Sequence, residues 1–278
     1  MPYINSGQSR LYYEEYGRGP AVVFLHGVGG NHASWFNQIP TFSKTYRAIV
    51  IDQRGFGNST DVEGLGRSAF VDDLKLLLDS LEIETVILVG QSMGGGTCLG
   101  FTCKFPERVG ALVLACTLIA IRIPAELKEF MEQVEKATSN LSQAERVLGP
   151  LTRKDEPERT LLYLQIASFN SVNVKTVKGA FAMHTPEELA ATGVPVLFAA
   201  GESDALFPPH AVRGTHARVR GSQYIELTQA GHSAYFETPA EFNKQVLDFL
   251  SAVRPRRNRR FIAPAEQQAS SGAAKPSA

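Results

Sequence analysis

Residues 90–94, Gly-Gln-Ser-Met-Gly, place a serine between two glycines, a spacing that can present its hydroxyl as a nucleophile. An apolar run at 86–89 precedes this motif and a helix-like stretch at 97–105 follows it, so we expect the chain to turn from strand to helix at Ser92. Such a turn strains the backbone of its central residue, and the flanking glycines have no Cβ atom to clash there. The alternative is a passive serine in a glycine-rich turn, and the flanking strand and helix argue against it.

A serine hydroxyl needs a base that removes its proton before it can attack. Among the six histidines, only His232 follows a late strand-like run, at 223–227, and precedes the last helix-like stretch. A loop at a strand end sits on a rigid scaffold that can aim a side chain. The sequence therefore predicts His232 as the base. The other histidines are His26, His32, His184, His210 and His216.

An acid that orients this histidine is expected at the end of a different buried strand. The apolar run 194–200 is followed by Glu202 and Asp204. We favour Asp204, which can leave the strand end and reach a histidine 28 residues further on, and we keep Glu202 as its local competitor. No carboxylate follows the run 111–115, which removes the other common position for the acid.

The first buried run, 21–25, ends in His26 and a glycine-rich loop at 27–30. Such a loop can direct backbone N–H groups at an oxyanion. We expect the amides of Val28 and Met93 to form this pair, with His26 holding the loop rather than acting as a base. A phosphate-binding loop is excluded because neither of the spacings typical of such loops, G-x-G-x-x-G and G-x-x-x-x-G-K-[ST], occurs in the sequence.

The positions of these residues depend on an alternation of strands and helices. Two short segments in which apolar and polar residues alternate, around Ile4 and at 10–16, predict an antiparallel hairpin. Buried strands are expected at 21–25, 48–51, 86–89, 111–115, 194–200 and 223–227, and amphipathic helices at 70–81 and 239–253. This pattern is typical of an α/β fold with a mostly parallel sheet.

One interval, 118–192, contains no strand-like run and is expected to form an inserted helical cap, with helices at 124–140, 142–148, 157–168 and 186–192. An ordinary helical excursion on the body is the alternative. The α/β core would then comprise 1–117 and 193–253. The tail 254–278 begins with five arginines in seven residues and is expected to be disordered, with a nucleic-acid or phosphate-binding arm as the alternative.

Composition narrows the class of protein further. The 278 residues carry 28 basic and 28 acidic side chains, so no net charge draws the chain to nucleic acid or an anionic membrane. Three cysteines are too few for a disulfide scaffold and lack zinc-ligand spacing, and the longest apolar run covers 11 residues. The first residues lack a basic segment and an apolar core, so we expect no signal peptide and a cytoplasmic protein.

Over residues 12–253 the chain resembles the α/β-hydrolase superfamily. Four motifs match in the family's order: His26-Gly27, residues 52–59 (Asp-Gln-Arg-Gly-Phe-Gly-Asn-Ser), the turn at Ser92, and Asp204 followed by Gly231-His232. The resemblance implies the α/β-hydrolase fold, with a mostly parallel eight-stranded sheet flanked by helices and a helical cap between the sixth and seventh strands. It also implies that residues 52–59 are structural, so Arg54 is not expected to be catalytic.

Within this superfamily the serine implies ester chemistry, because epoxide hydrolases and haloalkane dehalogenases use an aspartate at the turn. The chain looks most like serine carboxylesterases and enol-lactonases, which work through a Ser-His-Asp triad and an acyl-enzyme. Thioesterases, cofactor-free haloperoxidases, the rarer hydroxynitrile lyases and a slow receptor-like hydrolase remain as alternatives. Carbon–carbon bond hydrolases are disfavoured, because residues 28–31 read Val-Gly-Gly-Asn where those enzymes usually carry Gly-Pro-Gly.

Substrate contacts are expected from residues near the turn and from apolar residues of the cap. The candidates are Gln91, Trp35, Leu118, Ile119, Phe169, Phe181, Met183, Leu206 and Phe207. They predict a mostly apolar acyl or alcohol group on a small-molecule ester or lactone. We expect no metal, no cofactor and no nucleic-acid or membrane partner, and the oligomeric state is not predicted.

Overall fold

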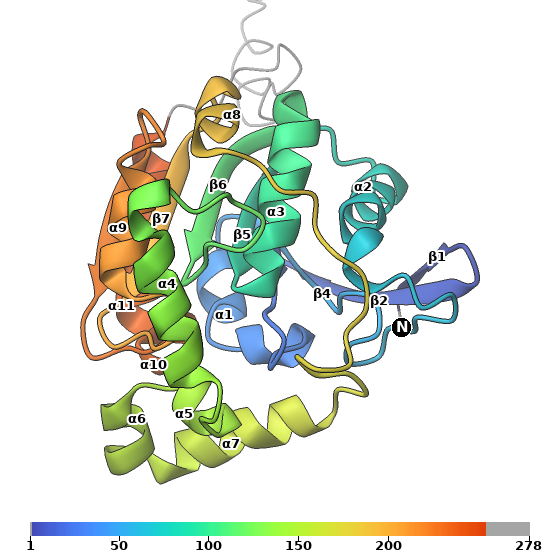
Figure 1. Ribbon diagram of the computed structural model, residues 1–278. Helices are drawn as coiled ribbons and strands as arrows, with labels where there is room; N and C mark the ends of the chain where they lie inside the picture. Colours follow the sequence, from blue (N-terminus) through green and yellow to red (C-terminus); the bar gives the residue numbers. More distant parts are fainter. Residues whose placement is uncertain (1, 254–278) are drawn as a thin grey trace, which may run out of the picture.

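A computed structural model describes residues 2–253 of the chain. Its centre is an eight-stranded sheet in the order β1-β2-β4-β3-β5-β6-β7-β8 (Figure 1). The antiparallel β1 and β2 form the predicted hairpin at one edge, β2 also runs antiparallel to β4, and the other pairs are parallel. The strands are β1 (Tyr3–Ser6), β2 (Ser9–Tyr16), β3 (Ala21–Leu25), β4 (Arg47–Ile51), β5 (Val86–Gln91), β6 (Val109–Ala115), β7 (Val196–Gly201) and β8 (Gln223–Leu227).

The parallel register places the carboxyl ends of the central strands at one edge of the sheet. Leu25 at the end of β3 lies opposite Gly90 of β5, and Gln91 lies opposite Ala115 at the end of β6. Every residue of β3 is buried, as expected of a strand covered on both faces. The loops that carry the expected site residues therefore leave the sheet side by side.

Two layers of helices cover the sheet. On one face, α2 and α3 contribute Leu74, Leu78 and Leu99 to the core, and α9 contributes Val212. On the other face, the core contains Phe42 of α1 and large apolar residues of α11. The elements of the body are η1 (His32–Trp35), α1 (Ile39–Phe42), η2 (Gly66–Ser68), α2 (Phe70–Ser80), α3 (Met93–Lys104), η3 (Pro106–Arg108), α9 (Pro209–His216), α10 (Ala234–Glu237) and α11 (Pro239–Ala252).

The chain between β6 and β7 contains the helices α4 (Ala125–Thr138), α5 (Gln143–Val147), α6 (Pro150–Asp155), α7 (Pro157–Ser168) and α8 (Pro186–Ala191). Capping boxes begin α5 at Ser142 and α8 at Thr185. Helices α4 to α7 form one lobe, and the chain then returns past the α2 side of the sheet to α8, which packs against α3 (Figure 1). We use "cap" below for residues 118–185.

Two elements differ from their predictions. Helix α3 begins at Met93, earlier than the expected residue 97. Gly94, Gly95 and Gly96 are helical although glycine has a low helix propensity, which is why the sequence did not predict this first turn. Helix α6 was not predicted; it is a short helix that begins at Pro150, a residue with the backbone angle of a first helical turn.

No helix within residues 2–253 combines the length and apolar character needed to cross a membrane. The predictions for the tail at 254–278 lie outside the described residues.

Candidate active site

Ser92 occupies the sharp turn between β5 and α3. Its φ of 49° and ψ of −117° are strained for a residue with a side chain. Its amide donates to the Ala115 carbonyl at 3.1 Å, and its carbonyl accepts from the Thr117 hydroxyl at 2.8 Å. Bonds from the end of β6 and the loop after it thus hold the strained residue on both sides.

Gly94, two residues after Ser92, is required by the close approach of α3 to the loop after β3. A Cβ atom at Gly94 would lie 2.1 Å from the Leu25 carbonyl oxygen and 2.8 Å from the His26 carbonyl oxygen. No side chain fits at this distance from backbone atoms. The amino end of α3 therefore packs directly against the glycine-rich loop that follows β3.

His232 and Asp204 meet across the ends of β7 and β8. The His232 Nδ1 atom lies 3.1 and 3.0 Å from the two Asp204 carboxylate oxygens, and both side chains are buried. An Nδ1–H that donates to a carboxylate leaves Nε2 free to accept a proton. His232 is thus held in the tautomer that a general base requires.

The structure distinguishes the two acids that follow β7. Asp204 Oδ1 also accepts the amides of Leu206 and Phe207 at 2.8 and 3.0 Å, which fixes the carboxylate beside His232. Glu202 is exposed and accepts the Gln229 amide at 2.8 Å instead.

The loop after β3 carries the expected oxyanion donors. Val28 and Met93 both line the cavity that contains Ser92 and His232. Within residues 2–253, neither of the two amides donates a hydrogen bond to another group. Both N–H groups are therefore available to a bound oxyanion.

The side chain of His26 contacts the loop that follows β3 and the backbone after β4. Its Nε2 accepts the Gln53 amide at 3.0 Å, and its Nδ1 lies 2.7 Å from the Gly27 carbonyl, so both nitrogens are engaged. Burial lowers the pKa of His26, which keeps the ring neutral and able to accept. This agrees with a structural role for His26.

The segment 52–59 is likewise tied into the body. Arg54 is buried and forms a two-pronged bond to the Asp73 carboxylate at 2.9 and 2.7 Å. Asp52 accepts the amides of His32 and Asn58 at 2.6 and 2.8 Å. None of these residues lines the cavity at Ser92, so their contacts are those of a structural segment.

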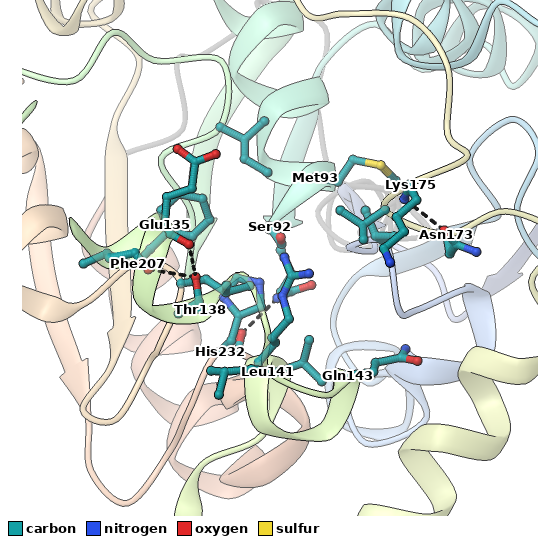
Figure 2. A pocket seen from close by; sticks show the side chains of 18 of the residues that line it. Ser92, Met93, Glu135, Thr138, Leu141, Gln143, Asn173, Lys175, Phe207 and His232 are labelled. Atoms are coloured by element: carbon teal, nitrogen blue, oxygen red, sulfur yellow. Dashed lines mark hydrogen bonds between the residues drawn. The ribbon is translucent and has the colours of Figure 1, made fainter. Parts of the chain in front are cut away.

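The cavity above Ser92 has a volume of about 950 Å³ and is roofed by the cap. Figure 2 shows Ser92 and His232 near the centre of the view, with Met93 to the upper right and Leu141 and Gln143 of the cap below Ser92. Ser92 is only 8% exposed and His232 only 3%, so the reacting groups are shielded from bulk water. An enclosed site of this size suits a small organic molecule.

The residues predicted to contact substrate divide into two groups. Gln91, Ile119, Leu206 and Phe207 line the cavity. The Gln91 amide also donates to the His232 carbonyl at 2.9 Å, so it positions the histidine loop.

The other five predicted contacts do not line this cavity: Trp35, Leu118, Phe169, Phe181 and Met183. Trp35 is completely buried against Tyr235, at 4.2 Å between ring centroids, and Leu118 is in the core beneath α3. Phe169 and Met183 are 75% and 50% exposed, and Phe181 packs on Phe70. Their apolar character reflects packing or surface position, which the sequence alone does not distinguish from a pocket wall.

Sequence reasoning missed the polar groups that the cap brings to the cavity. Besides His232, the lining contains four basic and two acidic side chains: Arg67, Lys128, Glu132, Glu135, Arg146 and Lys175. Five of these six come from the cap. The prediction of an apolar substrate group rested on the few charges that lie near the apolar candidates in the sequence, whereas these six charged side chains come from other positions along the chain.

Two polar residues, the buried Glu237 and the half-buried Asn170, connect the cap to the loops of the active site. The Glu237 carboxylate of α10 accepts the Gly149 amide and the Thr152 hydroxyl of the cap at 2.6 and 2.7 Å, and the Gly231 and Ser233 amides on either side of His232 at 3.0 and 3.2 Å. Burial raises the pKa of Glu237, while the four hydrogen bonds oppose that rise. One carboxylate therefore bonds the cap and the histidine loop at once.

On the opposite side, Asn170 after α7 joins the cap to the oxyanion loop. Its side chain donates to the Gly30 carbonyl at 3.1 Å and accepts the Gly57 amide at 3.0 Å. Asn31 in turn donates to the Ile166 carbonyl of α7 at 3.0 Å. The cap is thus hydrogen-bonded to both loops that flank Ser92.

Comparison with known proteins places this geometry in a family. Residues 20–146 match the family model described as alpha/beta hydrolase fold. A 2-hydroxy-6-oxononadienedioate/2-hydroxy-6-oxononatrienedioate hydrolase of Escherichia coli is 30% identical, over 87% of this chain and 91% of the relative. The chain therefore belongs to the α/β-hydrolase family, as the sequence motifs predicted.

Two solved structures extend the comparison to the whole fold. A thermophilic esterase from Thermogutta terrifontis has a TM-score of 0.76 at 25% identity and covers 91% of this chain and 99% of its own. Est816, described as an N-acyl homoserine lactone degrading enzyme, has a TM-score of 0.76 at 26% identity and covers 89% of this chain and 100% of its own. The eight-stranded, mostly parallel sheet with its flanking helices is therefore that of an α/β hydrolase.

Proposed function

We propose that the protein is a serine hydrolase that cleaves a carboxylic ester or lactone through an acyl-enzyme. The observation that carries the proposal is the meeting of three parts at one enclosed cavity: a strained Ser92, the His232–Asp204 pair, and the free amides of Val28 and Met93. The esterase and the lactone-degrading enzyme with similar folds support the same bond type.

In the proposed first step, Ser92 Oγ attacks the ester carbonyl carbon while His232 Nε2 takes the hydroxyl proton. Asp204 holds the imidazole and stabilises the imidazolium that forms. The carbonyl oxygen becomes an oxyanion and binds the Val28 and Met93 amides, which stabilise it more than the neutral carbonyl. His232 then protonates the leaving alcohol, and the acyl group remains on Ser92.

The second step reverses these roles with water as the nucleophile. His232 removes a proton from water, the hydroxide attacks the acyl carbonyl, and Ser92 leaves with the proton returned to it. A lactone follows the same course, except that its alcohol remains part of the acyl chain throughout, so that hydrolysis of the acyl-enzyme releases a single hydroxy acid.

A carbon–carbon bond hydrolase is the second candidate, because the E. coli relative at 30% identity is named as a hydrolase of an oxo-dienedioate. Such a reaction needs a polar pocket for a dicarboxylate, and the cavity contains four basic side chains. The loop sequence at 28–31 still lacks the Gly-Pro-Gly of that group. We therefore rank ester hydrolysis first.

Steady-state hydrolysis of p-nitrophenyl esters from acetate to laurate, together with γ- and δ-lactones and a vinylogous 1,5-diketone acid, tests the proposal. We expect sustained turnover of an ester or lactone that Ser92→Ala abolishes. Turnover that survives this substitution would disprove the mechanism. A single burst that then stalls would indicate a receptor-like protein, and cleavage of the diketone alone would favour the second candidate.

A further inference from the structure

We infer that the active-site cavity recognises a substrate that carries a carboxylate, bound by Arg146 and Lys175 on the oxyanion-loop side of Ser92. This inference rests on the proposed function and specifies the substrate class. It replaces the apolar substrate group predicted from the sequence.

Arg146 lies on the cavity face of α5. Gln143, Arg146 and Val147 line the cavity at positions i, i+3 and i+4, so one helical face points toward Ser92. Helix α5 passes close to the oxyanion loop, because a Cβ atom at Gly29 would lie 3.2 Å from the Gln143 side-chain nitrogen. The guanidinium is thus carried by an element that overlies the oxyanion donors.

The Arg146 side chain is half-buried, yet within residues 2–253 it forms no hydrogen bond or ion pair. Its sequence neighbours Arg153 and Arg159, by contrast, bond to the Leu148 carbonyl and the Glu156 carboxylate. A guanidinium that is partly removed from water without a partner is costly, and a bound carboxylate would offset that cost.

Lys175 provides a second cation from the return segment of the cap. Its backbone is fixed in a turn, because its amide donates to the Asn173 side chain at 2.9 Å and the Asn173 amide donates to Thr176. Within the described residues its ammonium is also unpaired, and it lines the cavity. Lys175 and Asn173 lie on one side of Ser92, while Glu135 and Phe207 lie on the other (Figure 2).

The two walls of the cavity therefore differ in charge. The α4 wall carries Lys128, Glu132 and Glu135, with a net charge of −1, whereas the remaining lining carries Arg67, Arg146 and Lys175, with +3. Arg67 already donates to the Gly179 carbonyl. The excess positive charge of the lining thus comes from segments other than α4, among them those of Arg146 and Lys175, and it attracts an anionic substrate.

Matched substrate pairs test this inference and locate the carboxylate. For the acyl side, mono-p-nitrophenyl glutarate is compared with p-nitrophenyl valerate. For the alcohol side, 4-carboxyphenyl butyrate is compared with 4-(methoxycarbonyl)phenyl butyrate. The variants are Arg146→Met, Lys175→Met and, as the matched control, Lys154→Met, which changes an exposed lysine of α6 that does not line the cavity.

In at least one pair, we expect Arg146→Met to lower the anionic-to-neutral ratio of kcat/KM by about 10- to 100-fold, because a charge-assisted bond is lost. Lys175→Met lowers it less, Arg146→Lys restores part of it, and Lys154→Met does not lower it. Rising salt lowers the wild-type ratio. A ratio that stays unchanged in Arg146→Met for both pairs would overturn the inference, while neutral-ester turnover would still support the proposed function.

Binding to an inactive variant gives a second measurement that does not depend on turnover. Calorimetry of Ser92→Ala with mono-p-nitrophenyl glutarate should show binding that is about 10-fold or more weaker after Arg146→Met is added. Equal affinity with and without Arg146, or no binding at all, would overturn the inference even if neither pair is hydrolysed.

Discussion

At the scale of the single residue, the site depends on how a neutral imidazole is held. The Asp204 carboxylate accepts hydrogen bonds from His232 Nδ1 and from two backbone amides. These bonds fix the orientation of the carboxylate and the tautomer of the histidine. An amide side chain at 204 would keep the shape of this contact but offer a donor, which favours the wrong tautomer of His232.

We therefore predict that Asp204→Asn lowers kcat by about 10³- to 10⁴-fold with little change in the melting temperature. Glu202→Gln is the matched control, because Glu202 follows the same strand but its carboxylate accepts the Gln229 amide instead of contacting His232. Initial rates on one p-nitrophenyl ester, with thermal melts of each variant, give the comparison. A larger loss in Glu202→Gln than in Asp204→Asn would show that the acid is misassigned.

The meeting of the three residues that we propose to react could be predicted from the sequence, because each one follows a strand. Ser92, Asp204 and His232 are recognised by residue type and by the apolar runs before them, and parallel strands bring such ends together. The residues of the substrate cavity gave no such signal. Arg146 and Lys175 reach it only through the path of the cap, and an arginine on a short helix is usually a surface residue.

At the scale of the element, the turn between β5 and α3 is the feature that the site needs most. It joins a strained Ser92 to a helix whose first turn packs on the backbone of the oxyanion loop. The sequence predicted the strand, the turn and the helix. It did not predict that α3 begins at Met93, because glycine has a low helix propensity. At Gly94 the close approach of the Leu25 backbone requires a glycine.

Gly94→Ala should accordingly lower the free energy of unfolding by about 1–3 kcal/mol and reduce kcat, since its Cβ atom displaces either α3 or the oxyanion loop. Gly110→Ala in β6 is the control, because its Cβ atom would have its nearest neighbour at 3.5 Å. Urea unfolding of both variants measures the difference. Equal stability of the two would show that the packing of α3 on the oxyanion loop is looser than described.

At the scale of the whole molecule, the cap and the body act as one structure at the active site. Glu237 connects the cap to the histidine loop, and Asn170 connects it to the oxyanion loop. The position of the cap between β6 and β7 could be predicted from the missing strand pattern. These connections could not, because they join residues far apart in the sequence, such as Gly149 and Glu237.

Glu237→Gln places an amide group where backbone donors need an acceptor, so we expect a loss of about 1–3 kcal/mol in the free energy of unfolding at neutral pH. The pKa of Glu237 is raised in the folded state. The folded protein therefore keeps the carboxyl proton of Glu237 over a pH range in which the unfolded chain has lost it. The contribution of Glu237 to the free energy of unfolding of the wild type is greatest below its pKa in the unfolded chain, near 4.5. It is lost as the pH rises through the pKa in the folded protein.

The stability difference between wild type and Glu237→Gln should therefore be larger at pH 4.5 than at pH 7.5. Urea unfolding at both values measures it, with Glu187→Gln, an exposed acid of α8, as the control. A difference that is constant with pH would contradict the raised pKa. A variant as stable as wild type would contradict the connecting role of Glu237.

The central claim is that Ser92 forms an acyl-enzyme, and trapping that species tests it most directly. Wild-type protein is mixed with p-nitrophenyl acetate, quenched in acid within milliseconds to seconds, and examined by intact mass and peptide mapping. Our account predicts one acetyl group on Ser92 in wild type, and none at that position in Ser92→Ala. Nitrophenol release with no acetylated Ser92, or an acetyl group on a different residue that forms at the rate of turnover, would contradict it.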